Sequence, residues 1–196
     1  MKICIVGGGS AGWMSAVTFL RTLKYDVTLV ESPNIAVSGV GESTLGQIQS
    51  WIDLVGIRDD EMDFIKATDA VLKHSIKFTN FLRKDSGGFQ YPFGFELLVS
   101  SKEWWKYRNT NPKEISFNDY GLGVNPIGLL AERGKFDVER PYAYQFDAIK
   151  FGQFLRKRYC QNVNHILADV VSFTPSDDGI GSIELDNGES ITADLF

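Results

Sequence analysis

The chain has 196 residues, 43% of them hydrophobic, and a formal net charge of −5 at pH 7. This length and apolar fraction are enough for a buried core in one domain or in two small ones. The acidic balance argues against nucleic acid as a partner, since no basic stretch offers a phosphate footprint. The absence of an apolar run of about 18 residues excludes a membrane-spanning helix.

The first predicted elements form a strand–helix–strand unit. Residues 2–6, KICIV, predict a short buried strand, glycines follow at 7–9, and residues 13–24 place apolar side chains at helical spacing. Residues 25–31, YDVTLVE, predict a second buried strand. Such a unit crosses over right-handed and gives parallel strands, the first half of a doubly wound α/β fold. The N-terminal apolar run is too short for a signal peptide and leads directly into the glycines.

The next predicted elements are a loop, two helices and a strand. Residues 33–43 predict a loop, after which Thr44 would cap a helix that ends near Val55. A second helix is predicted at 59–69, and the alternation of VLKHSIKFTNF predicts one strand at 71–81. Residues 83–145 are rich in aromatic residues, Gly and Pro, and predict irregular structure with a short helix near 101–108.

The C-terminal part is predicted to hold one helix and three strands. An amphipathic pattern predicts the helix at 146–160, and strands follow at 166–173, 180–185 and 190–196, with a turn at 186–188. The chain stops inside the apolar run ITADLF. Natural domains usually end in polar, exposed segments, so we expect a cut here rather than a domain boundary.

A nucleotide-binding motif lies between the first strand and the first helix. Gly7, Gly9 and Gly12 form GxGxxG, in which the glycines permit a tight turn, close approach of a pyrophosphate and close packing of helix on strand. The phosphates would lie at the helix N-terminus, where free N–H groups attract anions. Glu31 ends the second strand, in position to bind a ribose. These residues predict dinucleotide binding without separating FAD from NAD, and a glycine-rich turn without a ligand is the alternative.

The cysteines and histidines are few and widely spaced. Cys4 falls in a predicted strand and Cys160 at a predicted helix end, without CxxC spacing, which predicts reduced thiols of a cytoplasmic protein. His74 and His165 are the only two histidines. Neither a metal site nor a serine–histidine–aspartate triad is therefore predicted.

Three stretches together resemble the flavin-dependent halogenases, the tryptophan halogenase family. They are GGGSAGWM at 7–14, ESPNIAVSGVGEST at 31–44 and LKHSIKF at 72–78, and the similarity continues at 144–158 and 168–173. The resemblance implies a Rossmann-like FAD-binding fold of the flavin monooxygenase type. Family members are more than twice as long, so it also implies an incomplete, N-terminal part. Residues 1–196 would form a single FAD-binding unit, with 83–145 as an aromatic-rich insertion on the substrate side.

The resemblance also assigns cofactor-binding positions. The turn at the FAD pyrophosphate would be Gly7, Gly8, Gly9, Ala11 and Gly12. Glu31 would bind the adenosine ribose, with Ser32 and Ile35 beside it. The loop along the flavin would be Ser38, Val40, Glu42 and Ser43. Val171 would present backbone near the adenine.

The resemblance makes Lys73 the catalytic residue. Reduced flavin (FADH2), O2 and halide would form hypohalous acid, which Lys73 would direct onto an aromatic substrate. A strand lysine pointing to solvent is the alternative for Lys73, and Lys77 is expected to be structural. Tyr91 and Phe93 align with the two residues that sandwich the substrate ring, and ordinary core aromatics are the alternative for this pair. The family has a histidine at the position of Tyr91. Because of this difference, the expected substrate is not tryptophan specifically but an indole or another electron-rich aromatic.

The resemblance further implies partners. A flavin reductase would supply FADH2, and the substrate would be a small aromatic molecule. The W-x-W-x-I-P motif and the carboxylate that acts on the substrate would follow Phe196, so a missing C-terminal half or a second subunit would complete the site. Two alternatives are a non-catalytic or split FAD-binding module and a different flavin or NAD(P)H oxidoreductase.

Overall fold

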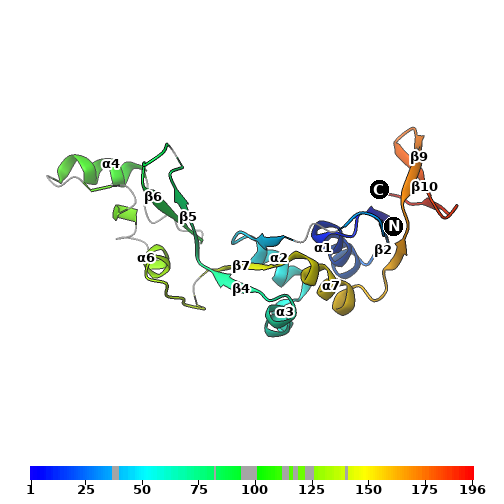
Figure 1. Ribbon diagram of the computed structural model, residues 1–196, viewed down its shortest axis with the longest axis horizontal. Helices are drawn as coiled ribbons and strands as arrows, with labels where there is room; N and C mark the ends of the chain where they lie inside the picture. Colours follow the sequence, from blue (N-terminus) through cyan, green and yellow to red (C-terminus); the bar gives the residue numbers. More distant parts are fainter. Residues whose placement is uncertain are drawn as a thin grey trace. The chain divides into compact units, whose positions relative to one another are not determined.

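The chain divides into two compact units in the computed structural model (Figure 1). The described residues are 1–36, 40–81, 83–93, 101–111, 115–116, 119–121, 126–139 and 141–196. Unit 1 contains Met1–Glu42, Ser50–Val71 and Phe146–Phe196, and unit 2 contains Ser43–Gln49 and Leu72–Gln145. The chain therefore enters unit 2 twice and returns to unit 1 each time.

A parallel three-stranded sheet organises unit 1. β2 (Asp26–Glu31) lies between β1 (Lys2–Val6) and β8 (Asn164–Leu167). Both pairings are parallel, as predicted for the first two strands. Their carboxyl ends consequently meet at one edge of the sheet, where ligands of open α/β sheets bind.

Helix α1 (Ser10–Thr18) connects β1 to β2 and continues as a π-helical turn at Phe19–Leu23. Its buried residues, Trp13, Ala16 and Val17, are apolar positions of the predicted helix. The neighbouring helix is α7 (Ala148–Tyr159), which packs on α1 (Figure 1). A Cβ at Gly152 of α7 would lie only 3.2 Å from Trp13 Cδ1, so this glycine lets the indole approach the helix closely.

The remaining helical elements of unit 1 include one that packs on β7 (Ala143–Asp147) and α7 through aromatic rings. These elements are α2 (Ile48–Val55), of which all but the first two residues lie in this unit, a 3₁₀ turn at Arg58–Asp60 and α3 (Glu61–Ala67). Phe64 of α3 is fully buried, and its ring centroid lies 5.9 Å from those of Phe146 and Phe151. The edge-to-face geometry is the one that aromatic pairs prefer.

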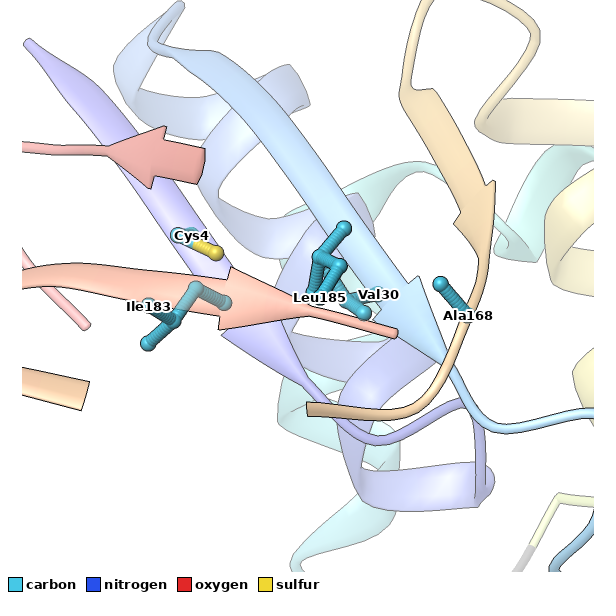
Figure 2. Close-up of a cluster of buried hydrophobic side chains, with 5 residues drawn as sticks. All are labelled: Cys4, Val30, Ala168, Ile183 and Leu185. Carbon is cyan, nitrogen blue, oxygen red and sulfur yellow. The ribbon is translucent and has the colours of Figure 1, made fainter. Parts of the chain in front are cut away.

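An antiparallel sheet at the end of the chain packs on the central sheet. Its strands are β9 (Val170–Ser176), β10 (Gly179–Leu185) and β11 (Ser190–Thr192), with β10 in the middle. Figure 2 shows Ile183 and Leu185 of β10 clustered with Cys4, Val30 and Ala168. This buried cluster joins the two sheets of unit 1.

Unit 2 contains a two-stranded hairpin and the helices α4 (Ser101–Thr110) and α6 (Pro126–Glu132). β5 (Ser75–Thr79) pairs antiparallel with β6 (Gly88–Pro92), which brings Phe78 opposite Phe89 with stacked rings 5.0 Å apart. A further small sheet has the order β3 (Gly41–Ser43), β7 (Ala143–Asp147), β4 (Val71–Lys73).

The prediction of a single strand at 71–81 is wrong, because the strand is interrupted at His74. β4 and β5 belong to different sheets. The His74 side chain, 3% exposed, accepts a hydrogen bond at Nε2 from Asp137 N (2.9 Å) and bonds through Nδ1 to Pro141 O (3.0 Å). Apolar and polar residues alternate on both sides of His74 without interruption, so the sequence pattern does not separate the two strands.

Other boundaries also differ from the prediction. Thr44 does not cap a helix: α2 begins at Ile48, and the Thr44 hydroxyl donates instead to Tyr144 O (3.0 Å). Helix α7 begins at Ala148 because the Asp147 side chain caps it, accepting from Lys150 N (2.9 Å). The strand predicted at 166–173 is split into β8 and β9, and that predicted at 190–196 ends at Thr192. The region 83–145 contains β6, α6 and most of β7, elements too short for a clear periodicity.

Alkaline pH is expected to destabilise the fold through Tyr159. Burial, followed by its hydrogen bond to Asp60 (2.8 Å), raises the pKa of Tyr159 from 10.0 to about 12. Below pH 10 the phenol is protonated in both states, whereas between about pH 10 and 12 only the unfolded chain loses the proton. Stability should therefore fall across this window, more steeply in the natural sequence than in Tyr159→Phe, as thermal unfolding measures. Parallel falls in the two proteins would contradict the prediction.

Candidate functional site

A cavity of about 720 Å³ opens at the carboxyl edge of the central sheet. Three segments at the carboxyl ends of parallel strands form three of its walls: residues 6–11 at the end of β1, 30–32 at the end of β2 and 168–170 after β8. The predicted cofactor-binding residues that line it are Gly7, Gly8, Gly9, Ala11, Glu31, Ser32, Ile35, Val40 and Glu42. The cavity therefore brings together residues that are far apart in the sequence.

The glycine turn leaves the start of α1 open toward the cavity. Gly7 has a φ of +122°, a conformation that side chains with a Cβ rarely adopt. A Cβ at Gly12 would lie 1.9 Å from Gly7 O, so this glycine allows α1 to approach the turn that follows β1. Gly9 precedes α1 and has only empty space where its Cβ would be. The first N–H groups of the helix therefore have no side-chain cap from Gly9 and can bind an anion.

The Glu31 side chain lies against the glycine turn and forms a hydrogen bond with a histidine of β8. Its carboxylate occupies the space beside Gly8, where a Cβ would lie 2.1 Å from Glu31 Cδ. His165 of β8 donates from Nε2 to Glu31 Oε2 at 2.8 Å. Sequence reasoning did not select His165; its signal is a polar residue inside the apolar strand NHIL.

Ser32 and Asp169 order the loop after β2. Ser32 Oγ accepts hydrogen bonds from the backbone N–H groups of Asn34 and Ile35, both at 3.1 Å, and donates to Asp169. The hydrogen bond from Ser32, with one from Asn34 Nδ2, lowers the pKa of the Asp169 carboxyl. The loop thus holds Ile35, which is 75% exposed, at the cavity. Asp169 was also missed, although it follows the third parallel strand at the same edge.

The remaining cofactor positions have different surroundings. Glu42 accepts a hydrogen bond from Ser10 Oγ at 2.7 Å, which links β3 to the start of α1. Ser38 lies outside the described residues. Val171 is 62% exposed, and the cavity is lined at this point by Ala168, Asp169 and Val170.

Lys73 forms a separate cluster in unit 2. Its Nζ donates to Ser43 Oγ at 2.6 Å and lies 5.2 Å from the centre of the Phe93 ring. Burial lowers the pKa of the Lys73 ammonium. Lys73 therefore does not have the surroundings of a lysine that points freely into solvent. Lys77 is more exposed, and its Nζ forms an ion pair with Glu132 at 3.1 Å.

The two aromatic residues predicted to hold a substrate ring differ in exposure. Phe93 is 4% exposed and packs beside both Lys73 and Gly46. Tyr91 is 51% exposed on β6, opposite Ile76 of β5. Phe93 thus contributes a buried wall to the lysine cluster, whereas Tyr91 presents its ring to the surroundings.

Within the described ranges, no three or more His, Cys, Asp or Glu side chains are grouped as they would be around a metal ion. The helices of the same ranges include none with the length and apolarity needed to cross a bilayer.

Comparison with known proteins places these features in a family. The family model described as tryptophan halogenase matches residues 2–196. Tryptophan 7-halogenase RebH from Lentzea aerocolonigenes is 32% identical, with 100% of this chain aligned to 41% of the relative. Among solved structures, the apo structure of VirX1 superposes with a TM-score of 0.82 at 34% identity, covering 99% of this chain and 41% of VirX1.

A flavin-dependent halogenase from Xanthomonas campestris superposes equally well, with a TM-score of 0.82 at 30% identity, covering 100% of this chain and 41% of that protein. The chain spans about two fifths of the length of the curated relatives it matches. It aligns with them along its whole length, from the glycine turn to the terminal sheet. The chain belongs to the tryptophan halogenase family and corresponds to the N-terminal part of its members.

Proposed function

We propose that the chain is the FAD-binding part of a flavin-dependent halogenase that acts on an indole or another electron-rich aromatic. The observation that carries this proposal is the cavity at the start of α1, lined by most of the residues that the halogenase resemblance assigned to FAD. The family match over residues 2–196 supports the reaction class.

The residues of the cavity fit an FAD. Gly7, Gly8 and Gly9 expose backbone beside the uncapped start of α1, which suits a pyrophosphate. Glu31 would accept hydrogen bonds from the adenosine ribose. Val40, Glu42 and Ser43, with Ser38, would follow the flavin, and the backbone at Val171 would lie near the adenine.

Bound as FADH2, the cofactor would supply two electrons and two protons that, with O2, a halide ion and one further proton, yield hypohalous acid, water and FAD. Lys73 would then act on the hypohalous acid through Nζ. Its ammonium can donate a hydrogen bond to the oxygen of the acid, which makes the halogen more electrophilic. The buried Phe93 ring beside Nζ excludes water from one side of the amine. Ser43, which binds Nζ, follows Glu42 of the cavity directly in the chain, so adjacent residues would serve the cofactor and the lysine.

We assign the substrate to residues 83–145, the proposed insertion of a single FAD-binding unit. Tyr91 and Phe93 would contact its ring, since both can stack on an indole or a phenol. The relatives named as tryptophan halogenases support an aromatic substrate. Tyr91 in place of the family histidine leaves the identity of the ring open to aromatics other than tryptophan.

The proposed reaction requires partners. A flavin reductase would supply FADH2, and residues equivalent to the remaining three fifths of the relatives would complete the site, as a C-terminal half or as a second subunit. A cytoplasmic location is proposed from Cys4 and Cys160, which are buried and not in a disulfide.

The proposal is tested on the polypeptide as its natural source makes it, with its length established by intact mass against 21.9 kDa for these residues. Supplied with a flavin reductase, NADH, FAD, bromide and a panel of indoles and phenols, it is expected to give products heavier by one bromine in place of one hydrogen. Omission of bromide provides the control. FAD binding without any halide-dependent product would favour a different flavin or NAD(P)H oxidoreductase of the same fold, or a non-catalytic FAD-binding module, over the halogenase.

A further inference from the structure

The two oxygens of the Glu31 carboxylate have different surroundings. Oε2 accepts the hydrogen bond from His165 Nε2 at 2.8 Å. Oε1 lies at the glycine turn, 2.4 Å from the point where a Cβ of Gly8 would be, and both Gly8 and Glu31 line the cavity. One oxygen is thus held by the protein, while the other lies at the cavity wall.

We propose that His165 is a positioning residue that fixes the Glu31 carboxylate for recognition of the adenosine ribose. This inference rests on the proposed FAD binding and adds a residue that the glycine motif does not contain. A carboxylate accepts hydrogen bonds at both oxygens, so His165 can occupy Oε2 while Oε1 accepts from a ribose hydroxyl. A side chain that is ordered before the ligand arrives loses less conformational entropy on binding.

The imidazole is itself held in place by packing. His165 lies on β8 with its Cα opposite that of Leu29 in β2, and its side chain is only 10% exposed. The Trp13 ring of α1 meets it edge to face, with centroids 5.2 Å apart and planes at 62°. Trp13 is buried in turn against Gly152 of α7. Packing therefore extends from α7 through Trp13 and His165 to the carboxylate.

This packing explains Trp13 as well. The indole follows the last glycine of the motif, yet it does not line the cavity. Its contact with His165 gives it an indirect part in cofactor binding, since it limits rotation of the ring that holds Glu31. Arg156 of α7 lies over the Trp13 ring itself, with its guanidinium carbon 5.9 Å from the ring centre. Two residues of α7, Gly152 and Arg156, therefore restrict the position of the Trp13 ring.

The test compares the affinities for ADP and 2′-deoxy-ADP, which differ only in one ribose hydroxyl, by calorimetry on the polypeptide as its source makes it. The natural sequence is expected to bind ADP about tenfold more tightly, the effect of one hydrogen bond to a charged group. In His165→Phe, which keeps a ring for Trp13 but cannot donate, this preference should fall toward one. His165→Gln, which keeps an N–H donor, should restore part of it.

A structural role alone predicts a different result. His165→Phe would then weaken both nucleotides by the same factor and keep the preference for ADP, which would overturn the inference but leave the proposed FAD binding intact. If His165→Phe does not fold, His165→Asn, whose amide is too short to reach Oε2, carries the same expectation. A natural sequence that binds neither FAD nor ADP would overturn the proposed function and this inference together.

Discussion

Replacing Lys73 with alanine is expected to slow halide-dependent product formation by about 100-fold or more, the usual cost of losing a proton donor at the reacting atoms. The affinity for FAD should not change, because Lys73 does not line the cavity at α1. Product formation under a saturating supply of FADH2, together with FAD affinity by fluorescence quenching, measures the two effects separately.

Two further variants sharpen the Lys73 experiment. Lys77→Ala is the matched control, since it removes a lysine of the adjacent strand that is exposed and paired with Glu132. It should retain the activity of the natural sequence. Ser43→Ala removes the hydroxyl that binds Nζ and should lower activity less than Lys73→Ala, because the ammonium itself remains. Undiminished halogenation in Lys73→Ala would exclude the role proposed for this lysine.

Gly12→Ala is expected to lower stability, whereas Gly9→Ala is expected to lower the affinity for FAD. A methyl at Gly12 would lie 1.9 Å from the backbone oxygen of Gly7, which no side-chain rotation can relieve. We expect the free energy of unfolding to fall by about 3 kcal/mol, at the upper end for overpacked cores. Gly9 has no atom near its Cβ position and a φ of −74°, so alanine should leave stability unchanged.

The cost of Gly9→Ala should appear in ligand binding instead. The methyl would project into the space where a pyrophosphate approaches the backbone, and FAD affinity should drop about tenfold or more. Thermal unfolding without ligand and FAD titration give the two readouts for each variant. Equal FAD affinity in Gly9→Ala and the natural sequence would place the phosphates elsewhere, whereas a stable Gly12→Ala protein would contradict the packing of α1 on β1.

The parts of the fold that the sequence predicted well are local. β1, the glycine turn, α1 and β2 follow one another within 31 residues, and each has its own signal in the apolar pattern or in the glycines. Glu31 was placed in the same way, since it ends a strand next to that turn. Such signals need no knowledge of distant residues.

The missed residues depend on pairings between distant segments. His165 meets Glu31 only because β8 adds to β2 across 134 residues of sequence, and Asp169 reaches Ser32 across 137. The break at His74 likewise depends on Asp137 and Pro141. A periodic pattern records which face of an element is apolar, but not which partner will bond to a polar side chain within it.

The central position of β2 has a consequence for synthesis on the ribosome. β2 is complete at Glu31, but one of its two neighbours, β8, ends at Leu167, after helix α7 has crossed over. β1 likewise gains a contact only late in synthesis, since Cys4 N donates a hydrogen bond to Leu195 O near the end of these residues. Contacts of such long range form slowly. A nascent chain therefore carries the complete glycine motif long before the third wall of the cavity exists, so the cofactor meets a finished site only after nearly all of these residues have emerged.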